Sequence, residues 1–411
     1  MKKLLFLLLP ALLMSDDLHS LLLYAKKHNN LIHAATITTQ AKQKELSSAQ
    51  DNYYPTLDFG GFYQRDDDPT PFRSGTTYGA SAKILFNIYD GGKKSYTKKQ
   101  KQQELQSKKH SAKETTQSLM LLITKDFYNL KTLYASLSAR QEASKAVKAQ
   151  LERVEAFYKA QLATSDDVDR LQSAYDSNVY AIDSLKFKIL SLKKALELQV
   201  GKNISSLEDS HFKKKMNQTP SKLQSIQAMQ SSQNALGNLS QTIDSYYYPN
   251  IQLEDKYTLY GYQDKPLFGG KPIPQLDKQN TLLATLNLRL LDFGVLREQK
   301  EALKLQGDAL AEQIIYKSKE QKMQLELSRK RIETALLNIK SSRSALKAAT
   351  SALKTITKKY DAGIVDNVVY LDALSSKTQA KALYEKSLND LEIAYAIYYY
   401  YNSKDIEEFL Q

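Results

Sequence analysis

The side chains that most often carry catalysis or bind metals are few and scattered in this sequence. Cysteine is absent, so neither a disulfide framework nor a thiolate metal site is available. Of the five histidines, His28 and His33 lie five residues apart and the others are isolated, which is no metal-ligand spacing. Gly91-Gly92 lacks the further glycines and the Lys-Ser/Thr of a phosphate loop. The sequence therefore predicts no enzyme, no metal site and no cofactor.

The charge of the chain permits several partners. There are 58 Lys and Arg against 45 Asp and Glu, a formal charge of +13, which would suit nucleic acid, anionic lipid or acidic substrates. The lysine-rich stretch from Lys93 to Lys113 lacks the interleaved aromatic residues of a single-strand nucleic-acid site. We therefore expect no nucleic acid partner, and expect this stretch to meet lipid head groups or solvent.

The first residues indicate export. Met1-Lys2-Lys3 is a short basic region, and an apolar run from Leu4 to Leu13 follows it before the charged pair Asp16-Asp17. This order is typical of a secretory signal peptide, which we assign to residues 1–15. No later segment approaches the roughly twenty consecutive apolar residues of a membrane-spanning helix. Any contact with a membrane is therefore expected to be made by strands.

The two halves of the chain repeat each other. The landmarks are Tyr53-Tyr54-Pro55 with Tyr247-Tyr248-Pro249, Asp90 with Asp292, and Tyr158 with Tyr360. The offset is 194 residues for the first landmark and 202 for the other two. Such self-similarity indicates an internal duplication. We assign residues 16–200 to repeat 1 and 221–411 to repeat 2, with a polar connector at 201–220.

Each repeat contains one long helical pattern without proline. In repeat 2, apolar and small residues recur three and four residues apart from Ile332 to Tyr360, and repeat 1 keeps the register from Leu130 to Tyr158. A strict seven-residue period on a helix of about 3.6 residues per turn produces left-handed supercoiling against a neighbour. A short turn and a second helix follow in each repeat. The expected antiparallel helical hairpins cover residues 93–200 and 294–401.

The segments that precede the long helices alternate between apolar and polar residues. In 281–290 Leu282, Leu286 and Leu290 share one face, and 77–88 repeats the pattern. With their partners they form two expected strand pairs, at 54–89 and 249–291. Strands of this length with aromatic residues at their ends suit a membrane barrel, and the edge of a soluble sandwich is the alternative. Four strands cannot enclose a lumen, so several chains would have to share the barrel.

Together these features resemble the TolC-like outer membrane efflux channels. The resemblance rests on Tyr-Pro before each strand pair, Asp-Gly or Asp-Phe-Gly where strand becomes helix, and a Tyr-x-x-Gly turn before Val368-Val369-Tyr370-Leu371-Asp372-Ala373. It implies a mainly α fold with a membrane β-barrel shared by a homotrimer and a coiled-coil tunnel across the periplasm. It also implies an outer membrane location in contact with lipid, and two partners, a periplasmic adaptor and an inner-membrane pump.

The resemblance also points to a gate at the hairpin turns. Asp372 matches one of two inward aspartates of the family, whereas the position of the other holds Val369. Tyr360 matches a tyrosine that helps to hold the tunnel shut, but Val365 stands where an arginine would be expected. The lock is therefore expected to use other bonds.

The turns themselves supply further candidates. Asp166, Asp167 and Asp366 keep some local acidity, although helix capping is a sufficient reason for them. Gly363 suits a left-handed residue, and Gln161 in its place would be strained by roughly 1 kcal/mol or adopt another turn. The residues expected to contact an adaptor are Ala160, Gln161, Leu162, Ala362, Gly363 and Ile364.

Two functions of different classes follow from this reading. The first is a passive exit duct of a tripartite efflux or type I secretion system, gated by iris-like movement of the hairpins. The second is a non-conducting periplasmic coiled-coil scaffold or surface protein. A scaffold has no need of four alternating strands at barrel length, so the strands favour the duct.

Overall fold

The computed structural model describes residues 16–67, 70 and 74–411. The expected signal peptide lies outside the described residues. Within them the chain forms two compact units, each built from parts of both repeats, and each is described by itself. The described residues of unit 1 fall within Met1–Thr36, Ala112–Gln224 and Lys317–Gln411, and those of unit 2 within Ile37–Ser111 and Ser225–Tyr316.

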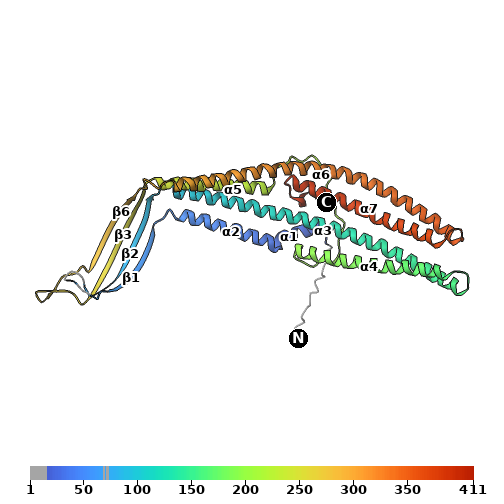
Figure 1. The fold of residues 1–411 in the computed structure, drawn as a ribbon, viewed down its shortest axis with the longest axis horizontal. Coiled ribbons are helices and arrows are strands. Elements are labelled where there is room, and N and C mark those ends of the chain that lie inside the picture. The colour runs from blue at the N-terminus through green and yellow to red at the C-terminus, as the bar shows by residue number, and fades with distance from the viewer. Residues whose placement is uncertain (1–15, 68–69, 71–73) are drawn as a thin grey trace, which may run out of the picture. The chain divides into compact units, whose positions relative to one another are not determined.

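Unit 2 contains an antiparallel sheet of four strands in the order β1-β2-β3-β6 (Figure 1). The strands are β1 (Thr56–Arg65), β2 (Thr76–Tyr89), β3 (Asn250–Gln263) and β6 (Lys278–Asn287). Between β3 and β6 lie two further strands of two residues each, β4 (Leu267–Phe268) and β5 (Lys271–Pro272), which pair with each other. The sequence pattern did not predict them. The order joins the two repeats through β2 and β3, which leaves β1 and β6 as edge strands.

The pairing repeats with the offsets found in the sequence. Thr56 pairs with Leu85 in repeat 1, and Asn250 pairs with Asn287 in repeat 2, which are the same positions displaced by 194 and 202. Side chains of paired residues lie on the same face of a sheet. One face is therefore mostly apolar, with residues such as Leu57, and the other is mostly polar. A row of the apolar face contains Leu57, Ile84, Asp255 and Leu282, and the corresponding row of the polar face contains Asp58, Lys83, Lys256 and Thr281.

Strand β6 ends earlier than the sequence pattern predicts. The alternation extends to Leu290, but the strand stops at Asn287, so the expected limit of 291 for the second strand pair is too long. In repeat 1 the equivalent residues, from Phe86 to Tyr89, belong to β2 because β3 supplies their partner. Leu288 to Leu291 have no partner strand on that side within one chain. Edge position, rather than residue type, shortens β6.

The helices of unit 2 approach the sheet from both repeats. They are the greater part of α2 (Asn30–Asp51), the start of α3 (Lys93–Lys159), α5 (Gln224–Asp244) with the short 3-10 helix Ser245–Tyr247, and the start of α6 (Val295–Asp361). Asp90 and Asp292 accept backbone N–H bonds at the starts of α3 and α6, which explains the repeated aspartate. The Asp-Gly and Asp-Phe-Gly motifs thus mark where strand becomes helix.

Unit 1 contains the greater part of two long helical hairpins. Hairpin 1 consists of α3 and α4 (Ser165–Val200), and hairpin 2 of α6 and α7 (Asn367–Tyr401). Unit 1 also holds α1 (Leu18–His28), the first residues of α2 and the 3-10 helix Ile406–Phe409. Each long helix has 67 residues. No helix in the described part of the chain is long and apolar enough to cross a bilayer. The predicted mainly α fold class, with long hairpins and four principal strands per chain, is confirmed.

The predicted heptad seams face the interior. In repeat 2 Ile332 is fully buried and Ser342 is 2% exposed, and in repeat 1 Leu130 is fully buried and Val147 is 1% exposed. The buried Ser342 hydroxyl pairs with that of Ser387 on α7 at 2.8 Å. Small residues at the seam therefore allow α6 and α7 to approach closely, because neither backbone is held away by a large side chain.

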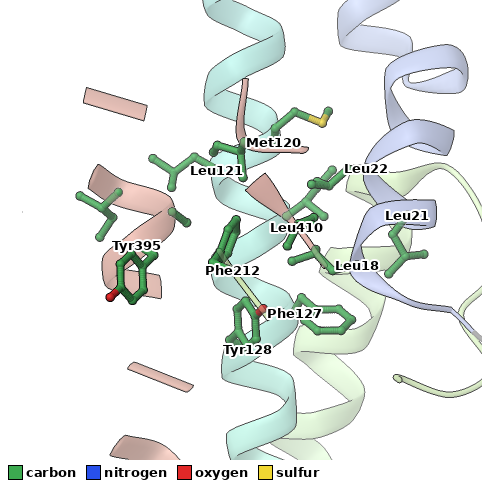
Figure 2. Close-up of a cluster of buried hydrophobic side chains, with 14 of the residues drawn as sticks. Leu18, Leu21, Leu22, Met120, Leu121, Phe127, Tyr128, Phe212, Tyr395 and Leu410 are labelled. Atoms are coloured by element: carbon green, nitrogen blue, oxygen red, sulfur yellow. The ribbon is translucent and has the colours of Figure 1, made fainter. Parts of the chain in front are cut away.

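The connector at 201–220 is anchored to the core of unit 1. Figure 2 shows Phe212 among buried side chains that include Tyr128 of α3 and Leu410 near the C-terminus. The Tyr128 hydroxyl donates to the Ser210 carbonyl at 2.8 Å. The buried Glu392 carboxylate of α7 accepts the Phe212 N–H at 2.8 Å. The connector is thus fixed by hydrogen bonds to both hairpins rather than left as a free linker.

Candidate functional site at the hairpin turns

The two hairpin turns have the same backbone geometry. In the first, the Leu162 N–H bonds the Phe157 carbonyl at 2.8 Å and the Gln161 N–H bonds the Tyr158 carbonyl at 2.9 Å. The second turn repeats both bonds 202 residues later, with Gly363 in the left-handed position at φ 70°. This pair of bonds is a Schellman motif, which closes the exposed carbonyls of a helix end.

Gln161 adopts the left-handed conformation that the sequence analysis considered costly. Its φ is 63°, where a side chain contacts its own backbone unfavourably. We expect Gln161→Gly to stabilise the turn by about 1 kcal/mol, which slows hydrogen exchange of the Leu162 amide about fivefold. The control is Ala160→Gly, because Ala160 has no positive φ to relieve. Faster exchange in Gln161→Gly than in the parent protein would show that the turn is not strained.

All six residues proposed for adaptor contact are exposed at the turns. Among them Leu162 is 76% exposed and Ile364 is 70% exposed. Each turn therefore presents one large apolar side chain to solvent. The flanking Ala160 and Ala362 are small, so the apolar side chain is accessible from several directions.

The acidic residues near the turns have separate local roles. Asp167 completes a capping box with Thr164 at the start of α4, and Asp366 caps α7 by accepting the Val369 N–H at 3.1 Å. Asp166 pairs with Arg170 one turn along α4 at 2.7 Å. Helix capping therefore accounts for Asp167 and Asp366, as was expected from their positions.

Asp372 is placed differently from these residues. It lies more than one turn inside α7, is exposed, and forms no ion pair with the residues that the structure describes. Helix capping does not explain it. Its place on the helix leaves the carboxylate available to solvent or to another copy of the chain.

Two polar links join hairpin 1 to hairpin 2 close to the turns. The Arg153 guanidinium of α3 contacts the Asp361 carboxylate at the end of α6 at 2.6 Å. The Asn367 amide of α7 donates to the Asp167 carboxylate at 3.2 Å. Asp167 therefore serves both as a capping residue of α4 and as an acceptor for hairpin 2.

A third link lies farther from the turns. Glu142 of α3 contacts two lysines on α7, Lys381 at 2.5 Å and Lys377 at 3.3 Å. The hydrogen bond from Lys381 is the main cause that lowers the pKa of Glu142. The carboxylate therefore stays charged at neutral pH, and this link persists there.

An apolar cluster lies between these links. It contains buried residues from α3, α4 and α7, among them Val147, Leu171 and Leu374. Tyr360 packs at its edge, with its ring stacked on Tyr370 at a centroid distance of 5.1 Å. Burial raises the pKa of both tyrosines, so both are neutral at physiological pH. Tyr360 thus contributes by stacking within hairpin 2. Val365, five residues further along the chain, is half-buried.

Sequence reasoning did not identify Glu142, Arg153 or Asn367. A usable signal was present, because Glu142 and Arg153 flank the heptad seam, where charged residues commonly pair between helices. Their partners could not be chosen without knowing how the two hairpins pack. No group of His, Cys, Asp and Glu that could hold a metal occurs in the described residues. Polar contacts near the turns therefore join the two hairpins.

Two long helical hairpins and a four-stranded antiparallel sheet with two open edges make up the fold of the chain. The sequence model of the outer membrane efflux protein family matches residues 21–186 of the chain. No curated protein shows significant sequence similarity to it.

Several solved structures share this fold over nearly its whole length. The outer membrane channel CmeC of Campylobacter jejuni has a TM-score of 0.83 and 14% identity, covering 94% of this chain and 85% of that one. The outer membrane protein VceC of Vibrio cholerae has a TM-score of 0.78 and 15% identity, covering 95% of this chain and 96% of that one. The outer membrane channel MtrE of Neisseria gonorrhoeae, in its open state, has a TM-score of 0.78 and 14% identity, covering 95% of this chain and 89% of that one.

The predicted resemblance is therefore confirmed. The chain carries the sequence pattern of the outer membrane efflux proteins over most of repeat 1 and has the fold of these outer membrane channels throughout.

Proposed function

We propose that the chain is one subunit of a homotrimeric exit duct in the outer membrane. In this proposal the sheets of three copies form one barrel in contact with lipid, and the hairpins form a tunnel through the periplasm. The observation that carries the proposal is the sheet itself, which has an apolar face, a polar face and two unpaired edges. Three copies of four strands give twelve, between the roughly eight strands that fill a barrel with side chains and the sixteen of a porin.

The internal repeat predicts how the copies pair. Within the chain Ile84 of β2 pairs with Asp255 of β3. The equivalent of Ile84 in repeat 2 is Leu286, 202 residues later, and the equivalent of Asp255 in repeat 1 is Gly61, 194 residues earlier. The repeat therefore places Leu286 of β6 opposite Gly61 in β1 of the next copy. The same rule places Arg289 opposite Asp58 of the next copy, which joins a cation to a carboxylate. Residues 288–291, which lack a partner in one chain, would then extend β6.

The junction below the sheet gives independent support. Gly91 at the start of α3 lies against Ser245 and Tyr248 of repeat 2. The equivalent of Gly91 in repeat 2 is Phe293, which is 92% exposed. The equivalent of Tyr248 in repeat 1 is Tyr54, 194 residues earlier. Phe293 would therefore contact Tyr54 of the next copy, a side chain that is 71% exposed. Assembly would therefore cover two large side chains that one chain leaves in solvent.

Paired cysteines test this arrangement, because the chain has no cysteine of its own. In the variant Gly61→Cys with Leu286→Cys, we expect oxidation to give covalent trimers on a non-reducing gel. Moving one cysteine by two residues, in Tyr63→Cys with Leu286→Cys, keeps the face but changes the register and should reduce cross-linking at least tenfold, since Cα atoms more than about 7 Å apart cannot be bridged. Efficient cross-linking of the second pair, or none of the first, would contradict the shared barrel.

The links between the hairpins suit a gate. Breaking Arg153–Asp361, Asn367–Asp167 and Glu142–Lys381 would release hairpin 2 from hairpin 1, and the tunnel would open by an iris-like movement. Contact of a periplasmic adaptor with the exposed Leu162 and Ile364 could supply the force, and an inner-membrane pump would deliver the cargo. Asp372 is proposed to line the tunnel near this gate.

A non-conducting periplasmic scaffold is the alternative function. It would use the hairpins and need neither the two-faced sheet nor the matched edges. The cross-linking experiment separates the two, because a scaffold predicts no specific contact between β6 and β1 of different copies. The proposal gives the chain no catalytic role.

A further inference from the structure

Hairpin 2 carries an open groove between α6 and α7. Its volume is about 860 Å³. Leu327 and Leu337 line it with side chains that are 52% and 69% exposed, whereas the small Ala335 is 8% exposed. Apolar side chains left in solvent around a hollow are typical of a surface that binds a partner.

Hairpin 1 carries a stripe of exposed apolar side chains on α4. Tyr180, Phe187 and Leu190 are 77%, 72% and 54% exposed. Spacings of seven and three residues place them on one face of the helix. On α7 the positions 202 residues after the last two hold Asn389 and Glu392, which are 8% and 7% exposed. The same helix face is therefore covered in hairpin 2 and open in hairpin 1.

The covered face of α7 packs against α3 of hairpin 1. The Asn389 amide donates to the Thr132 hydroxyl at 2.9 Å. Lys377 and Lys381 both contact Glu142. Asn389 lies ten positions after the midpoint of these two lysines, and Thr132 lies ten positions before Glu142. The two helices are thus antiparallel and in step, and Figure 1 shows α7 between α6 and α3.

The internal repeat converts this packing into a contact between copies. The equivalent of Thr132 in repeat 2 is Thr334, 202 residues later, and the equivalent of Asn389 in repeat 1 is Phe187, 202 residues earlier. The repeat therefore places Phe187 of one copy against Thr334 of the next. Thr334 lines the groove between α6 and α7. It is exposed, whereas Thr132 is half-buried, so the partner that covers Thr132 is missing at Thr334 in a single chain.

The rest of the stripe falls on the same groove. Seven positions before Phe187, the register places Tyr180 opposite Ser341. Three positions after Phe187, it places Leu190 opposite Arg331. Both Ser341 and Arg331 line the groove. The small serine leaves room for the tyrosine ring, and the aliphatic part of the arginine side chain can cover the leucine.

We propose that Phe187 of one copy fills the groove between α6 and α7 of the next copy, with Tyr180 and Leu190 beside it. This inference rests on the homotrimer of the proposed function and adds the surface by which the hairpins of different copies meet. The seam within a chain is held by polar links such as Asn389–Thr132. The seam between copies is apolar, because assembly removes the three exposed side chains of the stripe from water.

The accessibility of single thiols tests this surface in the full-length protein, because the chain has no cysteine of its own. Phe187→Cys and Leu162→Cys replace side chains that are 72% and 76% exposed in one chain, so neither change disturbs its fold. In the purified assembly we expect a maleimide to modify Phe187→Cys at least tenfold more slowly than Leu162→Cys. In urea the two rates should be equal. Equal rates in the native protein would overturn the proposal.

A pair of cysteines identifies the occupant of the groove. Oxidation of Phe187→Cys with Thr334→Cys should give covalent trimers on a non-reducing gel. In the control, Phe187→Cys with Leu327→Cys, one cysteine moves seven residues, or about 10 Å along α6, and cross-linking should fall at least tenfold. Efficient cross-linking of the control pair would contradict the register. A protected thiol at position 187 that does not cross-link to position 334 would mean that something other than the groove covers it.

The barrel pair, Gly61→Cys with Leu286→Cys, separates this inference from the proposed function. If the barrel pair gives covalent trimers and the groove pair does not, three copies share a barrel but their hairpins meet by another face. That result overturns the groove contact alone. If neither pair cross-links, the homotrimer and the groove contact are both wrong.

Discussion

Replacing Glu142 and Arg153 together by alanine is expected to raise the conductance of the assembled protein in lipid bilayers by about 2- to 30-fold. The double change removes the two ion-pair links between hairpin 1 and hairpin 2, Glu142 with Lys377 and Lys381 and Arg153 with Asp361. Partly exposed ion pairs contribute about 0.2–1 kcal/mol each. The combined loss of the two links therefore shifts the equilibrium between closed and open states by about 2- to 30-fold. The apolar cluster and the Asn367–Asp167 contact remain, so the hairpins stay folded.

The control for this prediction is Lys148→Ala. Lys148 pairs with Glu152 within α3 at 3.9 Å and links no second hairpin. Its loss should leave the conductance unchanged, although it also removes a charge from the same helix. Equal conductance of the double variant and the parent protein would mean that these contacts do not hold the gate closed.

Replacing Tyr399 by alanine is expected to lower the free energy of unfolding by about 3–5 kcal/mol. The side chain is fully buried, stacks on Phe409 at a centroid distance of 4.0 Å and donates its hydroxyl hydrogen bond to the Lys213 carbonyl. It therefore joins α7, the connector and the C-terminal segment. Tyr399→Phe keeps the ring and should cost only about 1 kcal/mol. Urea unfolding followed by circular dichroism, at fixed protein concentration, measures both.

The same pair of variants separates the ring from the hydroxyl at high pH. Burial raises the pKa of Tyr399 to about 12, above the value of about 10 of an unfolded tyrosine. The neutral hydroxyl thus contributes stability that is fully present below about pH 10 and is lost as the pH rises toward 12. Tyr399→Phe should show a smaller alkaline loss than the parent protein. Below pH 10, an equal decrease in the free energy of unfolding in the alanine and phenylalanine variants would show that ring packing is not the main contribution of Tyr399.

The periodic parts of the fold were predictable from the residues alone. The heptad seams from Leu130 and from Ile332 indicate both long helices, because a sustained seven-residue period has few other structural solutions. The alternating segments likewise indicate the four principal strands. Strand β6 was predicted too long because its last residues depend on a partner strand, and the sequence pattern does not show where a neighbour is missing.

The site was less predictable than the scaffold. The resemblance led to Tyr360, Asp372 and the turn residues, since these belong to local motifs. Arg153 and Asp361 lie far apart in sequence, and their contact depends on how the hairpins pack.

The central claim is that three copies enclose a conducting path. Single-channel recording of the purified protein in planar bilayers tests it most directly. The duct predicts discrete conductance steps of one size, retained after the Gly61→Cys and Leu286→Cys pair has been oxidised to covalent trimers. An inserted trimer that shows no steps, even with Glu142 and Arg153 changed to alanine, would contradict the duct and leave the scaffold as the better account.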